Sequence, residues 1–206
     1  MGGYKKGMEE SKRREIDQLL DQYEEEFEKS QKDYQWLFVR PDGKMQKGLM
    51  LIGEAPGKNE VLEGKPFVGA AGEKLKDFLK ILDLKRDDIY ITNIIKYRLY
   101  RINEKTNNMV NRPARKDEIE SSAIYLKKEI EILEPKVIVT LGNVALKGIL
   151  DNHSVSIGDY HGKRWDYNKS ILFPLYHPAS LIYNQKLIDE YNKDVLKLKE
   201  LLVSLR

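Results

Sequence analysis

Hydrophobic residues along the chain form two kinds of pattern. Short, almost continuous apolar runs are typical of strands buried on both faces, and they lie at residues 49–53, 89–95, 136–142 and 171–175. Apolar residues spaced three or four positions apart predict amphipathic helices at about residues 72–84, 116–133, 143–150 and 185–202. Because strands and helices alternate, the pattern predicts an α/β fold with a four-stranded parallel sheet covered by helices on both faces.

The N-terminal segment has a helical pattern of its own. Its apolar residues share one stripe, formed by Ile16, Leu19, Leu20, Tyr23 and Phe27. The stripe predicts an accessory helix over about residues 9–34 that docks on the main domain, preceded by a disordered tail at residues 1–7. We therefore expect a tail with an accessory helix at residues 1–35 and one domain at residues 36–206. The polar, Asn-rich stretch at residues 100–111 has no clear periodicity and is predicted to be a loop.

The chain contains no cysteine, which narrows the possible chemistry. Because none of the 206 residues is a cysteine, the chain cannot contain a disulfide, a zinc site built on thiolates, an iron–sulfur cluster held by cysteines or a cysteine nucleophile. With only three histidines, no metal and no cofactor are expected. The net charge of +3 is compatible with a polyanionic partner but does not indicate one by itself.

The sequence shows no sign of a membrane or secretory segment. No run of 18 or more apolar residues occurs, and the first residues are polar and charged rather than a signal-peptide core. We therefore expect a soluble, cytoplasmic protein without membrane attachment.

A loop rich in glycine follows the first apolar run. In GEAPGKNE (residues 53–60), two glycines and a proline within five residues force a tight turn that exposes backbone N–H groups. Such a loop can hold an anion or the edge of a small planar ligand, and the alternative is a plain turn between a strand and a helix. The loop is neither a Walker A sequence nor a dinucleotide fingerprint.

Three further side chains lie near predicted strand ends, where ligands bind in parallel sheets. Phe67, on a loop flanked by glycines, can stack on a flat ligand or pack in the core. Asn93 is an amide within an apolar run, and its partner is either the local backbone or the edge of a base such as uracil. His177, followed by a proline, is a better catalytic candidate than His153 and His161, which we expect at the surface.

These segments together resemble a known family. The motifs GEAPG (53–57), PFVG (66–69), ITNIIK (91–96) and HPAS (177–180) match, in order and approximate spacing, those of the uracil-DNA glycosylase superfamily, and family 4 in particular. The resemblance covers about residues 48–200. It implies a three-layer α/β/α fold and hydrolysis of the N-glycosidic bond of deoxyuridine in DNA, with the target nucleotide flipped into a tight pocket.

The resemblance also implies roles for residues of the pocket. By position, Phe67 would stack on uracil, Asn93 would bind its edge, and His177 would stabilise the negative charge on uracil O2. The residues of the first loop that would shape the pocket and the water site are Gly53, Ala55, Pro56 and Gly57. Ala55 stands where the best-known branch of the superfamily has a catalytic aspartate, so Glu54 or Glu60 would orient the water instead.

Contacts with DNA follow from the same resemblance. Leu181 or Ile182 lies where the superfamily often inserts an apolar wedge into the vacated base stack, and Ser180 beside them is expected to contact DNA as well. Lys58, Lys65 and Arg112 would contact phosphates, and each has a solvated surface as its alternative role. The wider basic set near the motifs adds Lys96, Arg98, Arg101, Arg115, Lys163 and Arg164.

The sequence departs from family 4 at the cysteines. Members of that family use four of them to hold a 4Fe–4S cluster, whereas Tyr97 and either Ser121 or Ser122 stand in two of the corresponding regions here. We expect the N-terminal helix, Trp36, Leu37 and Tyr97 to fill the place of the cluster by ordinary packing. Gly57, moreover, has no side chain with which to exclude the methyl group of thymine.

The leading prediction is therefore a monomeric DNA glycosylase that acts on uracil-containing DNA in base excision repair. Two alternatives stay open at this point. One is a non-catalytic protein of the same fold that binds DNA or damaged bases, and the other is a glycosylase for another deaminated base, such as hypoxanthine or xanthine.

Overall fold

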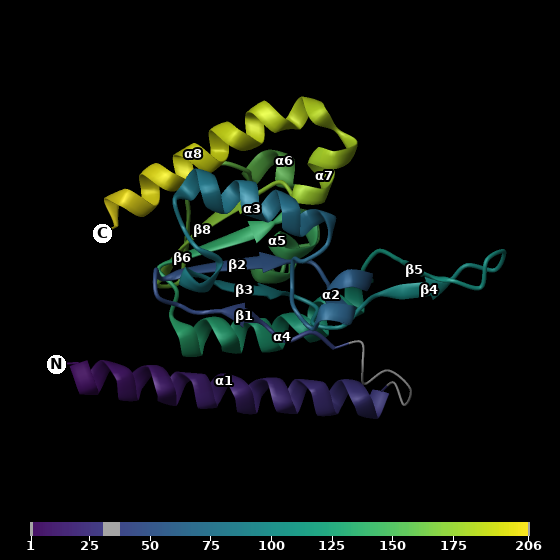
Figure 1. Ribbon diagram of the computed structural model, residues 1–206, viewed down its shortest axis with the longest axis horizontal. Helices are drawn as coiled ribbons and strands as arrows, with labels where there is room; N and C mark the ends of the chain where they lie inside the picture. Colours follow the sequence, from purple (N-terminus) through teal and green to yellow (C-terminus); the bar gives the residue numbers. More distant parts are fainter. Residues whose placement is uncertain (1, 31–37, 206) are drawn as a thin grey trace.

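A six-stranded sheet lies at the centre of the computed structural model, which describes residues 2–30 and 38–205 (Figure 1). Its strands are β1 (Asp42–Gly43), β2 (Leu49–Gly53), β3 (Tyr90–Asn93), β6 (Val137–Leu141), β7 (Trp165–Tyr167) and β8 (Ser170–Leu175). The spatial order is β1-β3-β2-β6-β8-β7. The four central strands are parallel, as predicted, and the two edge strands are antiparallel to their neighbours.

The edge strands were not predicted, because each has only two or three residues and no apolar run. The central strands, in contrast, are buried on both faces. Leu49 and Leu51 of β2 belong to one hydrophobic cluster, and Met50 and Ile52 belong to another on the opposite face of the sheet. Alternate residues of a strand point to opposite faces, so the continuous apolar run is the signature of two cores.

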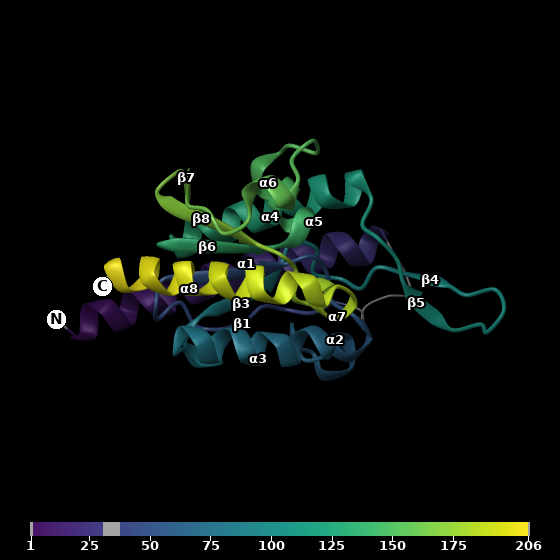
Figure 2. The same cartoon turned by 90° about the horizontal axis from the view of Figure 1, so that it is seen from above.

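Helices cover both faces of the sheet, which gives the three layers α/β/α seen in Figures 1 and 2. The first face packs against α3 (Ala70–Leu82) and α8 (Ile188–Ser204). The second face packs against α4 (Lys116–Leu133) and α5 (Gly142–Leu150). Three short helices complete the body, namely α2 (Lys58–Glu63), α6 (Ile157–Tyr160) and α7 (Pro178–Tyr183). Within the described residues, none of the helices is both long and apolar enough to cross a membrane.

The N-terminal helix α1 (Gly2–Ser30) lies alongside α4 (Figure 1). It begins seven residues earlier than the pattern indicates, so the prediction of a disordered tail is wrong for residues 2–7. The apolar stripe starts only at Ile16, and a charged helical extension without such a stripe carries no periodic signal. The predicted end at residue 34 lies outside the described residues.

A second, two-stranded sheet corrects another expectation. Residues predicted to form a loop make a β-hairpin of β4 (Tyr100–Ile102) and β5 (Met109–Asn111), paired through Tyr100–Asn111, Arg101–Val110 and Ile102–Met109. Figures 1 and 2 both show this hairpin extending away from the body. Strands of three residues around a polar turn are too short for alternation to be recognised in the sequence.

Aromatic rings join α1 to the body. Phe27 of α1 stacks on Tyr97 with ring centroids 4.1 Å apart, and Tyr23 stacks on Tyr125 of α4 at the same distance. Tyr23 also donates a hydrogen bond to Ser122 Oγ over 2.6 Å. Phe38 meets Tyr23 edge-on at 5.4 Å. The expected packing of the N-terminal helix against Tyr97 is thus confirmed, while Trp36 and Leu37 lie outside the described residues.

Candidate active site

The carboxyl ends of the parallel strands border a pocket of about 360 Å³. Phe67, Asn93 and His177 line it, together with Ala55 and Gly57 from the first loop. These five residues come from four separate segments of the chain and were all predicted to serve one site. The volume is in the range of small-ligand pockets, and the position agrees with the rule that parallel sheets bind ligands at their carboxyl edge.

Phe67 reaches the pocket in a strained conformation. Its φ of 53° lies in the left-handed region, which non-glycine residues adopt at a cost of about 1–3 kcal/mol. Arg86 secures this turn, because its guanidinium donates to the carbonyl oxygens of Phe67 and Pro66 and pairs with Asp42 at 2.8 Å. The ring is buried, and its centroid lies 6.0 Å from that of His177 with 27° between the ring planes.

Gly53 allows the side chains of Phe67 and Asn93 to approach each other. A Cβ at this position would lie 2.4 Å from Asn93 Oδ1 and 2.5 Å from Phe67 Cζ, both far inside van der Waals contact. Gly53 therefore shapes the site from behind, without lining the pocket itself. Glu54 and Pro56 of the same loop also lie outside the pocket lining.

Asn93 ends strand β3 with its amide at the pocket. The side chain is 5% exposed, and within the described residues no hydrogen bond engages the amide group. Its main-chain oxygen accepts a hydrogen bond from Lys96 Nζ over 3.0 Å. A buried amide without a protein partner is available to a ligand that offers one donor and one acceptor.

Lys96 is held behind the site and cannot reach a phosphate. Its side chain is fully buried and pairs with the equally buried Glu129 at 2.5 Å. Glu129 also accepts a hydrogen bond of 3.0 Å from Tyr90. The suggestion that Lys96 contacts DNA is therefore wrong, because an ammonium group buried with its counterion is committed to the core.

His177 is positioned as a neutral hydrogen-bond donor. It is the N-cap of α7, and its Nδ1 accepts the backbone N–H of Ala179 over 3.1 Å. Burial lowers the pKa of His177 to about 4, against the opposing effect of the Glu60 charge. In a neutral imidazole one nitrogen accepts and the other donates, so the proton resides on Nε2.

Glu60 fastens two loops of the pocket together. Its Oε1 accepts the backbone N–H groups of Val68 and Gly69, at 3.2 and 2.9 Å, and its Oε2 accepts that of Gly57 at 3.2 Å. The capping role was not predicted from the sequence, although a glutamate three residues after the N-cap, here Gly57, is the usual position for a carboxylate that caps backbone N–H groups.

Glu54 differs from Glu60 in its surroundings. Burial raises the pKa of the Glu54 carboxyl above its ordinary value, and a backbone hydrogen bond from Ala114 partly opposes this. A carboxyl group that holds its proton more tightly is a better base once ionised. Its side chain nevertheless stands outside the pocket lining.

The predicted DNA-contacting residues have different surroundings. Ser180 donates its hydroxyl hydrogen bond to the carbonyl oxygen of His177 at 2.6 Å, and Leu181 is buried in the core. Ile182, the alternative wedge, is 44% exposed. Lys58 and Lys65 are exposed, and Lys58 also lines the pocket.

Arg112 is engaged within the protein. It forms a two-pronged ion pair with Glu118 in the first turn of α4 and donates to the carbonyl oxygen of Pro113. The side chain is mostly buried, at 19% exposure. Any phosphate contact by Arg112 would have to compete with Glu118.

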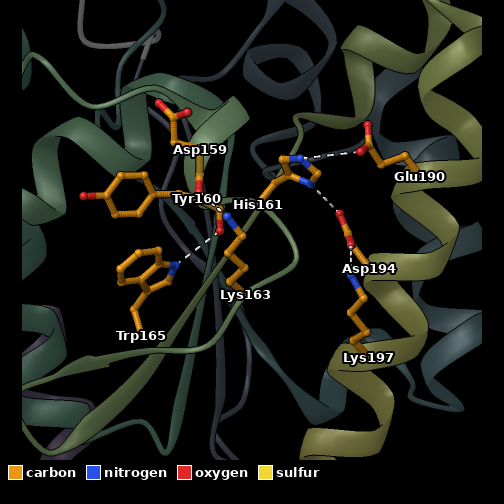
Figure 3. A network of polar contacts seen from close by, with 8 residues as sticks. All are labelled: Asp159, Tyr160, His161, Lys163, Trp165, Glu190, Asp194 and Lys197. Carbon is orange, nitrogen blue, oxygen red and sulfur yellow. Dashed lines mark hydrogen bonds and ion pairs between the residues drawn. The ribbon is translucent and has the colours of Figure 1, made fainter.

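His161 is not a surface residue, which corrects the sequence prediction. Its side chain is 15% exposed, and its Nδ1 lies 2.6 Å from the buried carboxylate of Asp194 (Figure 3). Lys197 pairs with the other oxygen of Asp194 at 2.8 Å, and the imidazole packs on Tyr176, with ring centroids 4.4 Å apart. Asp194 lies on the apolar stripe of α8. Because a buried carboxylate needs a hydrogen-bonding or charged partner, its position in the sequence could have indicated such a partner. His153, in contrast, is 30% exposed, and its Nε2 lies 3.2 Å from the carboxylate of the exposed Glu120.

The residues present do not fit an iron–sulfur cluster. The whole chain lacks cysteine, and among residues 2–30 and 38–205 no three histidine or carboxylate side chains are grouped to hold a metal ion. Tyr97 and Ser122, two of the positions noted for the missing cysteines, contact Phe27 and Tyr23 of α1 instead. Aromatic packing therefore occupies this side of the molecule.

Comparisons with known proteins agree with the motifs. The profile of the Uracil DNA glycosylase superfamily matches residues 41–199. A protein of Saccharolobus solfataricus named Type-4 uracil-DNA glycosylase is 38% identical over 197 residues, which cover 90% of this chain and 87% of the relative. Proteins with the same name from Sulfurisphaera tokodaii and Archaeoglobus fulgidus are 39% and 36% identical, covering 90% and 80% of this chain and 86% and 81% of the relatives.

Proposed function

Since the chain belongs to the uracil DNA glycosylase superfamily, we propose that it hydrolyses the N-glycosidic bond of deoxyuridine in DNA and releases uracil. One observation carries the proposal most directly. An aromatic ring, an amide without a protein partner and a neutral imidazole, from Phe67, Asn93 and His177, line the same pocket. A flipped pyrimidine requires a stacking surface, a partner for its hydrogen-bonding edge and a donor for its developing charge.

Recognition of the base falls to Phe67 and Asn93. The Phe67 ring offers a flat surface on which uracil stacks, and the Arg86 contacts to its backbone keep that surface fixed. The Asn93 amide donates to uracil O4 and accepts from N3–H. Cytosine presents the opposite polarity at both positions, so the same amide discriminates against it.

Departure of the base falls to His177. As the bond between C1′ and N1 breaks, both electrons move to uracil, and the negative charge spreads to O2. The Nε2–H of neutral His177 donates to that oxygen, and a preorganised donor of this kind contributes about 10²–10³-fold in rate. Because Nδ1 is fixed by Ala179, the imidazole needs no rearrangement at the moment of reaction.

Water attacks C1′ of the cationic sugar and gives up a proton, which neutralises the departing uracil anion, so that the products are uracil and an abasic deoxyribose. An oxocarbenium-like sugar needs only weak activation of the water. Glu60 lies at the pocket, but three backbone N–H groups hold its carboxylate. We assign it the positioning of the loop, together with a negative charge that favours the cationic sugar, rather than removal of the proton.

Contact with the duplex extends from the pocket rim. Ile182, exposed on α7 directly after the buried Leu181, serves as the wedge that occupies the vacated base stack. The exposed Lys58 and Lys65 bind phosphates on the strand that carries uracil. Arg112 contributes less, since Glu118 already neutralises it.

Incubation with uracil-containing oligonucleotides tests the proposal. The wild-type protein and a His153→Ala variant should convert single- or double-stranded substrate to abasic product, whereas His177→Ala should lose at least about 10²-fold in rate. His153 is the matched control, because it is a histidine paired with Glu120 outside the pocket lining.

Two outcomes would favour the alternatives. Salt-sensitive DNA binding without release of any base would indicate a non-catalytic binding protein. Release of hypoxanthine or xanthine, but not uracil, from a panel of modified oligonucleotides would indicate a glycosylase for another deaminated base.

A further inference from the structure

The hairpin formed by β4 and β5, residues 100–111 and called the hairpin arm below, starts at the rim of the pocket. Asn111, its last residue, lines the pocket and pairs with Tyr100. Arg98 fixes the end of the arm that joins the body, because its guanidinium donates to Asn111 Oδ1 at 3.0 Å and to the carbonyl oxygen of Met109 at 3.2 Å. The direction in which the arm leaves the body is therefore fixed by the same residues that border the pocket.

The tip of the hairpin arm is an ordered turn. Asn103 Oδ1 accepts the backbone N–H groups of Lys105 and Thr106, and the carbonyl oxygen of Asn103 accepts that of Asn107 at 2.8 Å. Asn107 adopts the left-handed conformation, with a φ of 52°, which asparagine tolerates well. The arm is thus preorganised and loses little conformational entropy when a partner binds it.

The side chains of the arm suit a polyanion with an exposed polar edge. Arg101 and Lys105 are exposed, and neither pairs with a carboxylate among the described residues. Asparagines at positions 103, 107, 108 and 111 carry amide N–H donors, although the amide oxygens of Asn103 and Asn111 already accept hydrogen bonds within the protein. Ile102 leaves 46% of its surface exposed. Only one acidic residue, Glu104, lies on the arm.

We propose that the hairpin arm is a DNA-binding arm that lies in a groove of the duplex beside the flipped nucleotide. The inference rests on the proposed function, since a duplex that delivers a nucleotide to Phe67, Asn93 and His177 must lie across the edge from which the arm projects. The three-residue strands of the ladder span about 10 Å, and the turn at residues 103–108 extends the arm beyond them. That length is enough to enter a major groove, which is about 12 Å wide and about 8.5 Å deep and admits a two-stranded β-ribbon.

Binding measurements test the arm without depending on catalysis. The double variant Arg101→Ala/Lys105→Ala is compared with the wild type for its affinity to a duplex of about 20 base pairs that carries an abasic site, over a range of salt concentrations. The loss of two phosphate contacts should weaken binding on the order of tenfold and reduce the slope of log affinity against log salt by about two. The matched control, Lys80→Ala/Lys85→Ala, removes two exposed lysines near the end of α3 and beyond it, and should change neither quantity.

A second variant removes the tip but keeps the ladder. Replacing residues 103–108 with Asn-Gly connects Ile102 and Met109, the last ladder pair, through a two-residue turn. This variant should bind duplex DNA more weakly. It should release uracil at the wild-type rate from a single-stranded oligonucleotide that is too short to reach the arm.

Duplex affinity and salt slope equal to those of the wild type in both variants would overturn the proposal and leave the arm to a protein partner. Failure of the wild type to release uracil from any substrate would overturn the proposed function instead, and the two results are separate because duplex binding is measured on abasic DNA.

Discussion

Gly53 lies so close to Phe67 that a methyl group on its Cα would be 2.5 Å from Phe67 Cζ. The same methyl group would be 2.4 Å from Asn93 Oδ1. Both contacts involve the ends of side chains, so the protein could relieve them by moving those two side chains. The relief would displace the two side chains to which we assign binding of the base.

Gly53→Ala should therefore impair activity much more than stability. Because a displacement of about 1 Å can cost on the order of 10²-fold in rate, we expect kcat/KM for a uracil-containing oligonucleotide to fall by about that factor. Gly158→Ala is the matched control, since a Cβ there meets only Ser156 Oγ at 3.7 Å. Equal kcat/KM for both variants and the wild type would show that Gly53 does not shape the site.

Burial of His177 should make folding stability depend on pH. Its pKa is about 4 in the folded protein against 6.5 for an ordinary histidine, so the unfolded chain binds more protons between these values. Stability is then fully present above pH 6.5 and falls by up to about 3 kcal/mol as the pH drops towards 4. Urea unfolding of the wild type and of His177→Asn at several pH values isolates this contribution. The hypothesis fails if the two proteins lose stability in parallel over this range.

The hydrogen bond between Tyr23 and Ser122 should reveal how α1 is attached. Tyr23→Phe leaves the buried Ser122 hydroxyl without its donor and should cost about 1–3 kcal/mol of unfolding free energy. Tyr23→Phe combined with Ser122→Ala removes both polar partners and should recover most of the loss. A double-mutant cycle measures the coupling, and strictly additive effects of the two changes would contradict it.

The buried pair of Lys96 and Glu129 makes a sharper prediction. Lys96→Met leaves the Glu129 carboxylate buried without its counterion, which should destabilise the protein by about 3–5 kcal/mol. Adding Glu129→Gln removes the orphaned charge and should restore part of that stability. Lys116→Met, at an exposed lysine of α4, is the control for loss of a positive charge. If Lys96→Met alone unfolds no more readily than this control, the ion pair contributes nothing.

Sequence reasoning succeeded where one physical signal dominated. The central strands are continuous apolar runs because both faces are buried, and the glycine-rich loop, Phe67, Asn93 and His177 follow such runs or the turns beside them. Parallel strands bring their carboxyl ends to one edge, so separate motifs predicted one pocket.

The sequence failed where the signal depends on tertiary partners. The edge strands and the hairpin arm are short and are held by backbone pairing. Neither presents a face to the hydrophobic core, so their sequences show no alternation of apolar and polar residues. His161 resembled a surface histidine because its partner, Asp194, is distant in sequence. Glu60 resembled a catalytic carboxylate because two of the three N–H groups that it accepts, those of Val68 and Gly69, become its neighbours only after folding.

The aromatic contacts between α1, Tyr97 and α4 have a consequence for how the protein matures. Because the aromatic side chains of the polypeptide itself hold α1 to the body, folding of this region requires no delivery of iron or sulfide. Oxidants that dismantle iron–sulfur clusters have nothing to attack at this place. The folded state should therefore be regained from denaturant in the presence of a chelator, under air, by the polypeptide alone.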